Sequence, residues 1–389
     1  MRLWVEIAHQ SLVRAGAEVC SDVIRTVQTE ELFFAVIVSG GRRVEGGATP
    51  IASSAASMLA FGTPLNAVVE TLLSALPQDE HVPFSILRVL GGRQGDLVEC
   101  DAPPLFMTRG GELVILPVVE EESHGRLIRT CEFPVQEGDH VAVVSEGYIR
   151  AKGWSRQWGW RDIATSIRRL TETRCDAEQL LGALIRSYEK LSQGKAARDV
   201  SILAMFVRPM RTAMVWSGPP ASSPSVPPPP SARGMEEVML EKLMNEPGTR
   251  IICGDTTAEI AARLLGAELE MEPRPEDGWM EVPPVSRLYG RPGIERIDLI
   301  TEGLVTLGKA RERMAGAQRA RDLPRKEDGA TRLARLLLTA DKVHFLVGMA
   351  INPAQTADKA GTVPLRRIVV EDLMNDLKAR GKIVSVEYF

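Results

Sequence analysis

The sequence lacks the patterns that mark several large classes of protein. No run approaches the ~20 uninterrupted apolar residues that a membrane-spanning helix needs. The opening segment MRLWVEIAHQ has charged and polar residues where a signal peptide would be apolar. The net charge of -4 favours neither a nucleic-acid partner nor a membrane surface. We therefore expect a cytoplasmic protein that binds no nucleic acid and no membrane.

Metal-binding motifs built from cysteine or histidine are missing as well. The five cysteines are dispersed along the chain without a CxxC pair, and the five histidines form no HxxxH or HExxH motif. An odd, scattered set of cysteines is typical of reduced thiols rather than of a disulfide framework. These absences argue against a zinc site.

Length and composition indicate a folded protein with more than one core. The chain has 389 residues, of which 44% are hydrophobic and 25% are charged. Such a composition is ordinary for globular proteins, and this length exceeds what one core usually supports. We therefore expect two domains.

A proline-rich stretch at residues 217–234, SGPPASSPSVPPPPSARG, contains almost nothing that could build a core. Prolines favour an extended conformation, so we predict a semi-rigid linker at residues 211–235 between domains at 1–210 and 236–389. A long loop inside one domain is the alternative, although such loops are uncommon in compact domains. A polyproline ligand for another protein is a third interpretation.

The order of strand and helix patterns differs on the two sides of this stretch. Before it, strand-like runs come in groups, such as residues 23–28 and 32–38, and helical patterns come in blocks, such as 48–61 and 65–76. This order is typical of antiparallel sheets covered by helices, an α+β fold. After it, strand-like and helical segments alternate, which predicts a smaller α/β domain with a mainly parallel sheet.

Five short motifs follow one another in the first half of the chain. They are CSDV at residues 20–23, AVIVSG at 35–40, DAPPLF with RGGEL at 101–113, VVSEG at 143–147, and ARDVSI at 197–202. In order and spacing they resemble the "GD", "ADG", "NPP…DGK", "VSDG" and "GDDTTV" elements of the SpoIIE-like branch of the PPM-type serine/threonine phosphatases. The resemblance implies an α/β/β/α sandwich.

The resemblance also implies a catalytic centre with two Mg²⁺ or Mn²⁺ ions. Bridged by carboxylates, such ions activate a water molecule for in-line attack on phosphoserine or phosphothreonine. Hard cations take oxygen ligands, most of them charged. By position in the motifs, the residual metal ligands would be Asp22, the carbonyl of Gly40, Glu146 and Asp199.

The match fails at two of the acidic positions. Ser39 stands where the family has its bridging aspartate, and Arg198 stands where the first aspartate of the late pair belongs. A guanidinium cannot deprotonate, and beside Mg²⁺ it costs roughly several kcal/mol. A register shift by one residue would make Asp199 the ligand, but it would not restore the carboxylate lost at Ser39.

The leading hypothesis is therefore a bacterial regulatory pseudophosphatase that binds a protein partner, with no catalytic residue and no cofactor assigned. The alternative is an active phosphoserine/phosphothreonine phosphatase that depends on Mn²⁺ or Mg²⁺. A third hypothesis places a small-ligand sensor or enzyme in the C-terminal domain.

Two further segments of the first domain stand out. The segment GWSRQWGW contains Trp154, Trp158 and Trp160 among basic residues. It could form a lip that binds a partner, but we favour a flap that packs on the sandwich. Residues 120–122 are three consecutive glutamates, which we interpret as a solvated turn.

Three predicted strand ends of the C-terminal domain carry small and polar residues. Ligands of open α/β sheets lie beyond the carboxyl ends of the strands, so these residues are candidates for a small anionic or nucleotide-like ligand. They are Gly254, Thr256, Thr257, Glu302, Gly348 and Asn352. The turn at Gly254 is neither a Walker A loop nor a GxGxxG motif. Helix capping by Asp255 or Thr256 is the alternative.

Overall fold

The computed structural model describes most of the chain. The described residues are 2–40, 48–76, 81–151, 159–173, 175–193, 196–221, 234–272, 282–290, 297–351 and 363–389. In these ranges no helix combines the length and the apolar character needed to cross a membrane.

The chain divides into two compact units, Met1–Pro209 and Met210–Phe389. The predicted linker at residues 211–235 is wrong, because β12 (Thr212–Ser217) pairs with strands on both sides in the sheet of the second unit. The proline-rich stretch follows β12 and precedes α6 (Met235–Asn245), so it connects two elements of one unit. This is the alternative interpretation, a long loop inside one domain. Residues 222–233 of the stretch lie outside the described residues.

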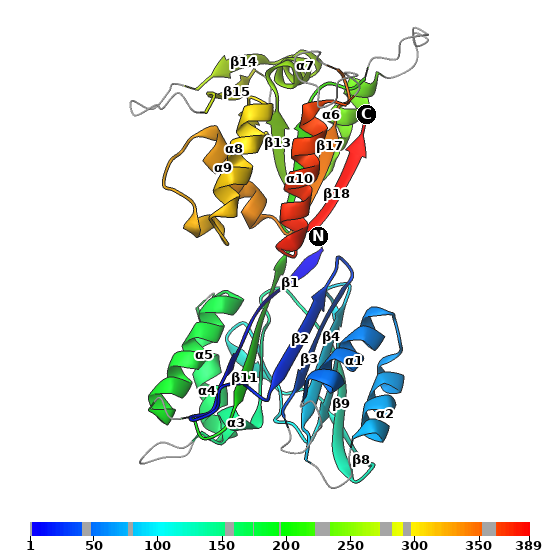
Figure 1. Ribbon diagram of the computed structural model, residues 1–389, viewed down its shortest axis with the longest axis vertical. Helices are drawn as coiled ribbons and strands as arrows, with labels where there is room; N and C mark the ends of the chain where they lie inside the picture. The colour runs from blue at the N-terminus through cyan, green and yellow to red at the C-terminus, as the bar shows by residue number, and fades with distance from the viewer. Residues whose placement is uncertain are drawn as a thin grey trace. The chain divides into compact units, whose positions relative to one another are not determined.

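The first unit contains two antiparallel sheets (Figure 1). In spatial order, the five-stranded sheet consists of β1 (Leu3–Leu12), β11 (Val200–Pro209), β10 (His140–Val144), β6 (Phe106–Arg109) and β7 (Glu112–Val114). The six-stranded sheet consists of β2 (Val23–Gln28), β3 (Leu32–Val38), β4 (Phe84–Leu90), β5 (Gln94–Cys100), β9 (Arg126–Pro134) and β8 (Val119–Ser123). The glutamates at 120–122 lie in the edge strand β8, so the predicted turn is wrong there.

Helices cover the outer faces of the two sheets. On the six-stranded sheet lie α1 (Ala48–Ala60) and α2 (Leu65–Ala75), and on the five-stranded sheet lie α3 (Glu146–Ile149), α4 (Trp160–Thr171) and α5 (Ala177–Ser192). Alternation along the strands explains the layers, since Phe33, Ala35 and Ile37 of β3 face the core between the sheets whereas Phe34 and Val36 face α1 and α2. The predicted α/β/β/α sandwich is confirmed.

The second unit is a single sheet between two layers of helices (Figure 1). Its strands in spatial order are β14 (Glu268–Met271), β15 (Val285–Tyr289), β16 (Leu299–Thr301), β13 (Thr249–Cys253), β12, β17 (Lys342–Val347) and β18 (Ile383–Tyr388). The last five in this order are mutually parallel, and β14 and β15 are antiparallel. The α/β domain with a mainly parallel sheet is confirmed.

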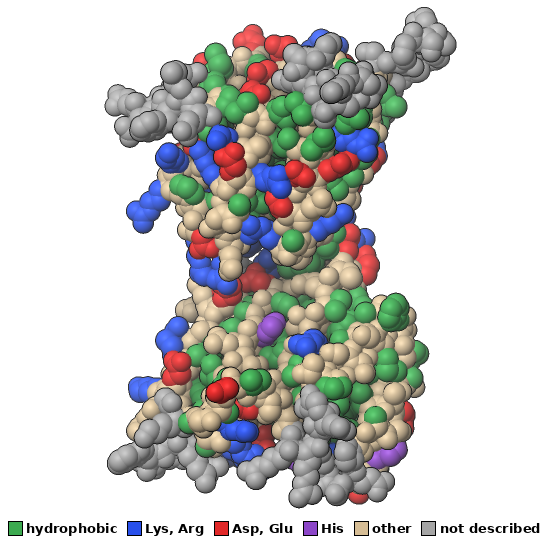
Figure 2. All heavy atoms as spheres, in the orientation of Figure 1, with side chains coloured by type: hydrophobic (Ala, Val, Ile, Leu, Met, Phe, Trp, Pro, Cys, Tyr) green, Lys and Arg blue, Asp and Glu red, His purple; other side chains and the backbone are tan. Residues whose placement is uncertain are grey.

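The helices of the second unit pack on opposite faces according to their order in the chain. One face is covered by α6 and α7 (Asp255–Leu265), and the other is covered by α8 (Leu304–Ala315), α9 (Gly329–Thr339) and α10 (Leu365–Ala379). The sheet therefore reverses its winding between β12 and β17, as in doubly wound folds. Basic and acidic side chains are interspersed on the face of this unit shown in Figure 2, and Arg311, for example, pairs with Asp372 and Asp376.

Candidate functional site

The predicted metal-site residues of the first unit meet at one end of its two sheets. Asp22 directly precedes β2 and Gly40 follows β3, and these two strands are neighbours. Glu146 follows β10 and Asp199 precedes β11, which are neighbours in the other sheet. The Ser21 backbone N–H donates to Asp199 at 2.8 Å, so the two sheets are joined here.

Asp22 is buried, and only one of its carboxylate oxygens has a hydrogen bond. Oδ1 accepts from the backbone N–H of Gly40 at 3.2 Å, whereas Oδ2 has no hydrogen-bond partner. A side chain at Gly40 would collide with Ser21, which explains why the chain needs glycine there. Burial raises the pKa of Asp22, and the charge of Asp199 adds to the rise, while the hydrogen bond from the Gly40 N–H offsets part of it.

Both oxygens of Asp199 accept hydrogen bonds from neighbouring loop residues. Oδ1 accepts from the Arg14 backbone N–H at 2.7 Å, and Oδ2 accepts from the Ser21 backbone N–H at 2.8 Å and from the Ser21 hydroxyl at 2.5 Å. Burial acts to raise the pKa of Asp199, but these hydrogen bonds and the Arg14 guanidinium outweigh it, so the pKa lies below its usual value. Asp199 thus fixes the connection between β1 and β2 to the start of β11.

Two arginines hold the carboxylate of Glu146. Arg150 Nη2 lies 2.5 Å from Oε1, and Arg198 Nη1 lies 2.7 Å from Oε2. Glu146 begins α3 and Arg150 lies four residues later, a spacing that brings two side chains together on a helix. Arg198 therefore contacts a carboxylate of the site instead of contributing one.

These residues do not fit a pair of divalent cations. Ser39 supplies no carboxylate, and two of the three remaining carboxylates already pair with groups of the unit. Across the described ranges, no group of three or more His, Cys, Asp or Glu side chains could hold a metal ion. A metal-holding site needs excess negative charge before the cation arrives, whereas Arg14, Arg150 and Arg198 match Asp22, Glu146 and Asp199 in number.

The tryptophan segment is described only at its end. Trp154 and Trp158 lie outside the described residues. Trp160 stacks on Phe106 of β6 with ring centroids 5.4 Å apart. This contact favours the packing interpretation for Trp160.

In the second unit, the predicted ligand residues lie at the carboxyl ends of adjacent parallel strands. The Gly254 N–H donates to Thr301 O at 2.8 Å, and the Gly348 N–H donates to Ser217 O at 2.9 Å. A side chain at Gly303 would come within 3.3 Å of the Gly254 Cα, so the loops after β13 and β16 touch. Asn352 lies outside the described residues.

The polar candidates of the second unit differ in their surroundings. Glu302 Oε2 accepts from the Thr306 N–H at 3.3 Å, so it occupies the start of α8. Thr256 is exposed, whereas Thr257 is fully buried and its hydroxyl has no hydrogen-bond partner. Helix α7 has Gly254 at its N-cap and no side-chain cap, which argues against capping by Asp255 or Thr256.

Sequence reasoning missed Arg366, which belongs to the same edge of the sheet. Its Nη1 lies 3.4 Å from Gly348 O, and a Cβ on Gly218, which follows β12, would overlap the guanidinium. Burial lowers the pKa of Arg366. Among the described residues no carboxylate pairs with it. An arginine near a helix start gives no sequence signal, because its neighbours Gly218 and Gly348 are remote in the chain.

Comparisons with solved structures found chains of similar fold, each covering just over half of this chain. The phosphatase domain of the cell fate determinant SpoIIE from Bacillus subtilis matches at 13% identity and a TM-score of 0.44, covering 58% of this chain and 99% of that one. The PP2C domain of SiaA from Pseudomonas aeruginosa matches at 15% identity and a TM-score of 0.42, covering 51% of this chain and 85% of that one. RsbX in complex with magnesium matches at 12% identity and a TM-score of 0.40, covering 52% of this chain and 95% of that one. Such identities concern the fold alone.

No family model and no curated protein matches the sequence.

Proposed function

We propose that the first unit is a regulatory pseudophosphatase, a SpoIIE-like phosphatase fold that binds a protein partner and has little or no metal-dependent hydrolysis. The pairing of its carboxylates with groups of the same unit supports this proposal. Glu146 is held by Arg150 and Arg198, and Asp199 by Arg14 and Ser21. A divalent cation would have to displace these groups.

The charge balance makes such displacement unfavourable. Bringing Mn²⁺ to Glu146 would separate two ion pairs and leave two guanidiniums close to the ion. These guanidiniums stay protonated at any physiological pH. Like charges about 4 Å apart repel by roughly 4 kcal/mol at the effective dielectric of a protein surface.

Calorimetric titration tests this proposal directly. Mn²⁺ added to protein stripped with EDTA should give no saturable heat, and p-nitrophenyl phosphate should be hydrolysed at nearly the rate without enzyme. The double variant Asp22→Ala with Glu146→Ala serves as the control and should leave any residual rate unchanged.

One observation favours the alternative, an active phosphatase. The unpartnered Oδ2 of buried Asp22 is a free carboxylate oxygen beside Gly40, whose carbonyl the family uses as a ligand. If wild-type turnover in Mn²⁺ is clear and the double variant abolishes it, the pseudophosphatase proposal is overturned and the Mn²⁺- or Mg²⁺-dependent phosphatase takes its place.

A second candidate function concerns the second unit, which we propose binds a small phosphate-bearing ligand. The half-buried guanidinium of Arg366, for which the described residues supply no carboxylate, supports it. It lies against Gly218 and Gly348, where the winding of the sheet reverses, and ligands of doubly wound sheets bind at that point. The buried Thr257 hydroxyl lies against the neighbouring turn at Gly254 and also has no partner.

The negative charge of Glu302 limits where along the strand edge an anion can bind. Its carboxylate occupies the start of α8, so the β16 side of the edge repels phosphate. The β12 and β17 side carries Arg366 and no described carboxylate in contact with it. Of the predicted residues, Gly254, Thr257 and Gly348 therefore stay in the proposed site, and Glu302 does not.

Thermal-shift measurements with nucleotides and inorganic pyrophosphate test the second candidate. A ligand present at 100 times its Kd stabilises the folded state by about 2.7 kcal/mol, so a shift of several degrees is expected. Arg366→Met should remove the shift, and Arg311→Met, which changes an arginine already paired with Asp372 and Asp376, should keep it. A shift that survives Arg366→Met would contradict the proposed site.

A further inference from the structure

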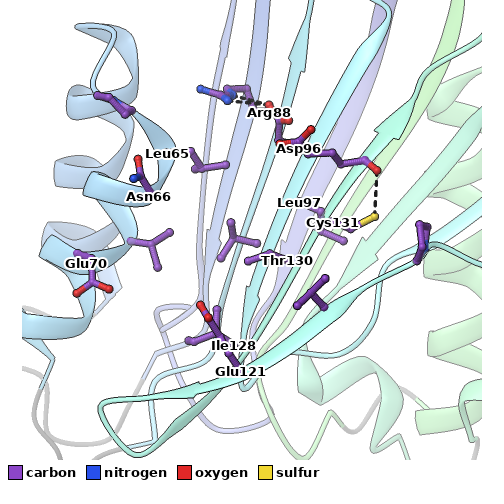
Figure 3. A pocket seen from close by; sticks show the side chains of 16 residues that line it. Leu65, Asn66, Glu70, Arg88, Asp96, Leu97, Glu121, Ile128, Thr130 and Cys131 are labelled. Atoms are coloured by element: carbon purple, nitrogen blue, oxygen red, sulfur yellow. Dashed lines mark hydrogen bonds and ion pairs between the residues drawn. The ribbon is translucent and has the colours of Figure 1, made fainter.

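A groove of about 670 Å³ lies on the outer face of the six-stranded sheet of the first unit (Figure 3). Helix α2 forms one wall, strands β4, β5 and β9 form the floor, and β8 with the preceding Pro117 forms the other wall. It is separate from the end of the sheets where Asp22, Glu146 and Asp199 meet, since none of these three residues lines it.

The floor of the groove is an apolar row of residues that the helices leave partly uncovered. Val98 of β5, Thr130 of β9 and Val119 of β8 are neighbours across the sheet and lie on one face. Val98 is buried in the cluster beneath α2, whereas Val119 is 64% exposed. The uncovered end of this row offers an apolar contact to another molecule.

Carboxylates flank this row on three sides. By strand register, Glu132 of β9 lies on one side of the row and Glu121 of β8 lies on the other. Glu70 projects from α2 (Figure 3). All three are exposed. None of them has an ion pair or a side-chain hydrogen bond within the described residues.

Among the described residues that line the groove, the one cation is already neutralised. Arg88 pairs with Asp96 at 2.7 Å, its direct neighbour across β4 and β5. Asp96 in turn lies directly opposite Glu132 across β5 and β9, and like charges facing each other across a sheet are destabilising. A positive charge supplied from outside would offset this repulsion.

The arrangement matches a peptide better than a metal ion. The three glutamates are distributed around an apolar row instead of converging on one point, and no described group of acidic side chains could hold a metal. Apolar contacts in the middle with opposite charges around them are the pattern by which grooves bind amphipathic helices. Charge complementarity therefore selects a basic partner.

We infer that this groove binds a basic amphipathic segment of a partner protein. Apolar side chains of the segment lie over Val98 and Val119, and its Lys or Arg side chains reach Glu70, Glu121 and Glu132. The inference rests on the proposed function in one respect, since it supplies the class of partner through which a pseudophosphatase acts.

A synthetic peptide of about 14 residues, with Leu at helical spacing and Lys elsewhere, is the probe. Calorimetry with the full chain in EDTA and about 0.1 M salt should show binding to one site. A scrambled peptide of the same composition should bind at least about tenfold more weakly, because it presents no apolar face.

Matched variants separate the groove from general charge attraction. The triple variant Glu70→Gln, Glu121→Gln and Glu132→Gln should weaken binding about tenfold, since each exposed ion pair contributes modestly. The control triple variant Glu137→Gln, Glu189→Gln and Glu259→Gln changes the net charge equally at exposed positions outside the groove and should leave binding unchanged.

A single pair of variants tests the apolar row. Val119→Ser should weaken binding, whereas Ile115→Ser, at an 89% exposed residue that does not line the groove, should not. Equal loss in the two triple variants, or equally tight binding of the scrambled peptide, would overturn the inference. The outcome is independent of the proposed function, because EDTA removes divalent metals here and metal-dependent turnover is measured separately.

Discussion

The two units treat the charged residues at their strand ends in opposite ways. In the first unit, the carboxylates of Glu146 and Asp199 are bonded by arginines, a serine and backbone N–H groups of the same unit. In the second, no carboxylate among the described residues pairs with the guanidinium of Arg366, which lies 3.4 Å from the carbonyl oxygen of Gly348. Internal pairing stabilises a fold, whereas a half-buried charge left unpaired is what a ligand site requires. The contrast predicts opposite effects of substitution in the two units.

The largest effect is expected from Asp199→Ala. It leaves the backbone N–H groups of Arg14 and Ser21 and the Ser21 hydroxyl without their acceptor, so the unfolding free energy of the first unit should fall by about 1–3 kcal/mol. Urea denaturation, with hydrogen exchange followed on peptides from β11, measures the change. Glu137→Ala, at an exposed residue, should stay within about 0.5 kcal/mol of the wild type. A loss for Asp199→Ala as small as that would remove the contrast between the units.

The double variant Ser39→Asp with Arg198→Asp should turn the paired site into a cation site. Ser39→Asp adds one carboxylate. Arg198→Asp replaces the guanidinium beside Glu146 with a second carboxylate. Mn²⁺ affinity should rise at least about tenfold, equivalent to 1.4 kcal/mol, as measured by calorimetry. Arg198→Asp alone should give a smaller gain, because Ser39 still lacks the bridging carboxylate. No gain in either variant would show that more than these two positions has diverged.

Asp22→Asn should raise the stability of the first unit at pH 7 by about 1 kcal/mol, because it removes a buried charge with one unsatisfied oxygen. Burial raises the pKa of Asp22, so the folded state holds its proton more tightly than the unfolded state does. The wild-type unfolding free energy should therefore fall as pH rises from about 4. Urea denaturation between pH 4 and pH 8 should show this fall reduced in the variant.

Asp199→Asn provides the control of opposite sign. The pKa of Asp199 is lowered, so its contribution to stability is present above pH ~4 and is lost as the pH falls through its folded value. The Asp199→Asn substitution should therefore leave the pH dependence of the unfolding free energy unchanged between pH 5 and pH 8. If both variants change the pH profile in the same direction, the assigned environments of the two carboxylates are wrong.

The smallest effect is expected from Arg366→Met. Burying part of a guanidinium without a carboxylate partner has a desolvation cost that few interactions offset. Removing it in Arg366→Met should leave the stability of the second unit unchanged or raise it by about 0.5 kcal/mol. Hydrogen exchange on peptides from β12 and β17 measures it. Arg313→Met is the control in the same unit, because Arg313 bonds Asp328 and Thr331 and its loss should be destabilising. A clear loss of stability in Arg366→Met would assign that residue a structural role.

Strongly patterned elements could be predicted from the sequence almost to the residue. The runs at 23–28 and 32–38 are β2 and β3, and the helical pattern at 65–76 is α2. The two strands are rich in β-branched and aromatic residues, and the helix has a clear apolar period. Strand β8 was missed because its sequence, VEEES, has a single apolar residue, which an exposed edge strand tolerates and a periodicity argument cannot detect.

The end of the first domain at residue 210 was predicted to within one residue, but the start of the second was not, because composition and topology disagree there. The proline-rich stretch is the sharpest change in composition, yet the chain leaves the first unit before it, at Pro209. Strand β12 is a short buried run, TAMVWS, whose partners β13 and β17 lie far along the chain. At the candidate site, motif order located Glu146 and Asp199, but the hydrogen bonds of Asp199 depend on loop geometry that no spacing rule provides.

The central position of β12 has a consequence for synthesis on the ribosome. The strand leaves the ribosome immediately after β11 completes the first unit, and one of its two neighbours, β17, begins only at Lys342, which pairs with Thr212. At about 5–20 residues per second, an apolar strand waits roughly 7–25 s for that neighbour. Even after β13 pairs with one of its edges, the strand keeps its other edge unpaired until β17 emerges, and an unpaired strand edge is a template for aggregation. The full chain should therefore depend on chaperones during translation, whereas a shortened chain that ends at Pro209 should not.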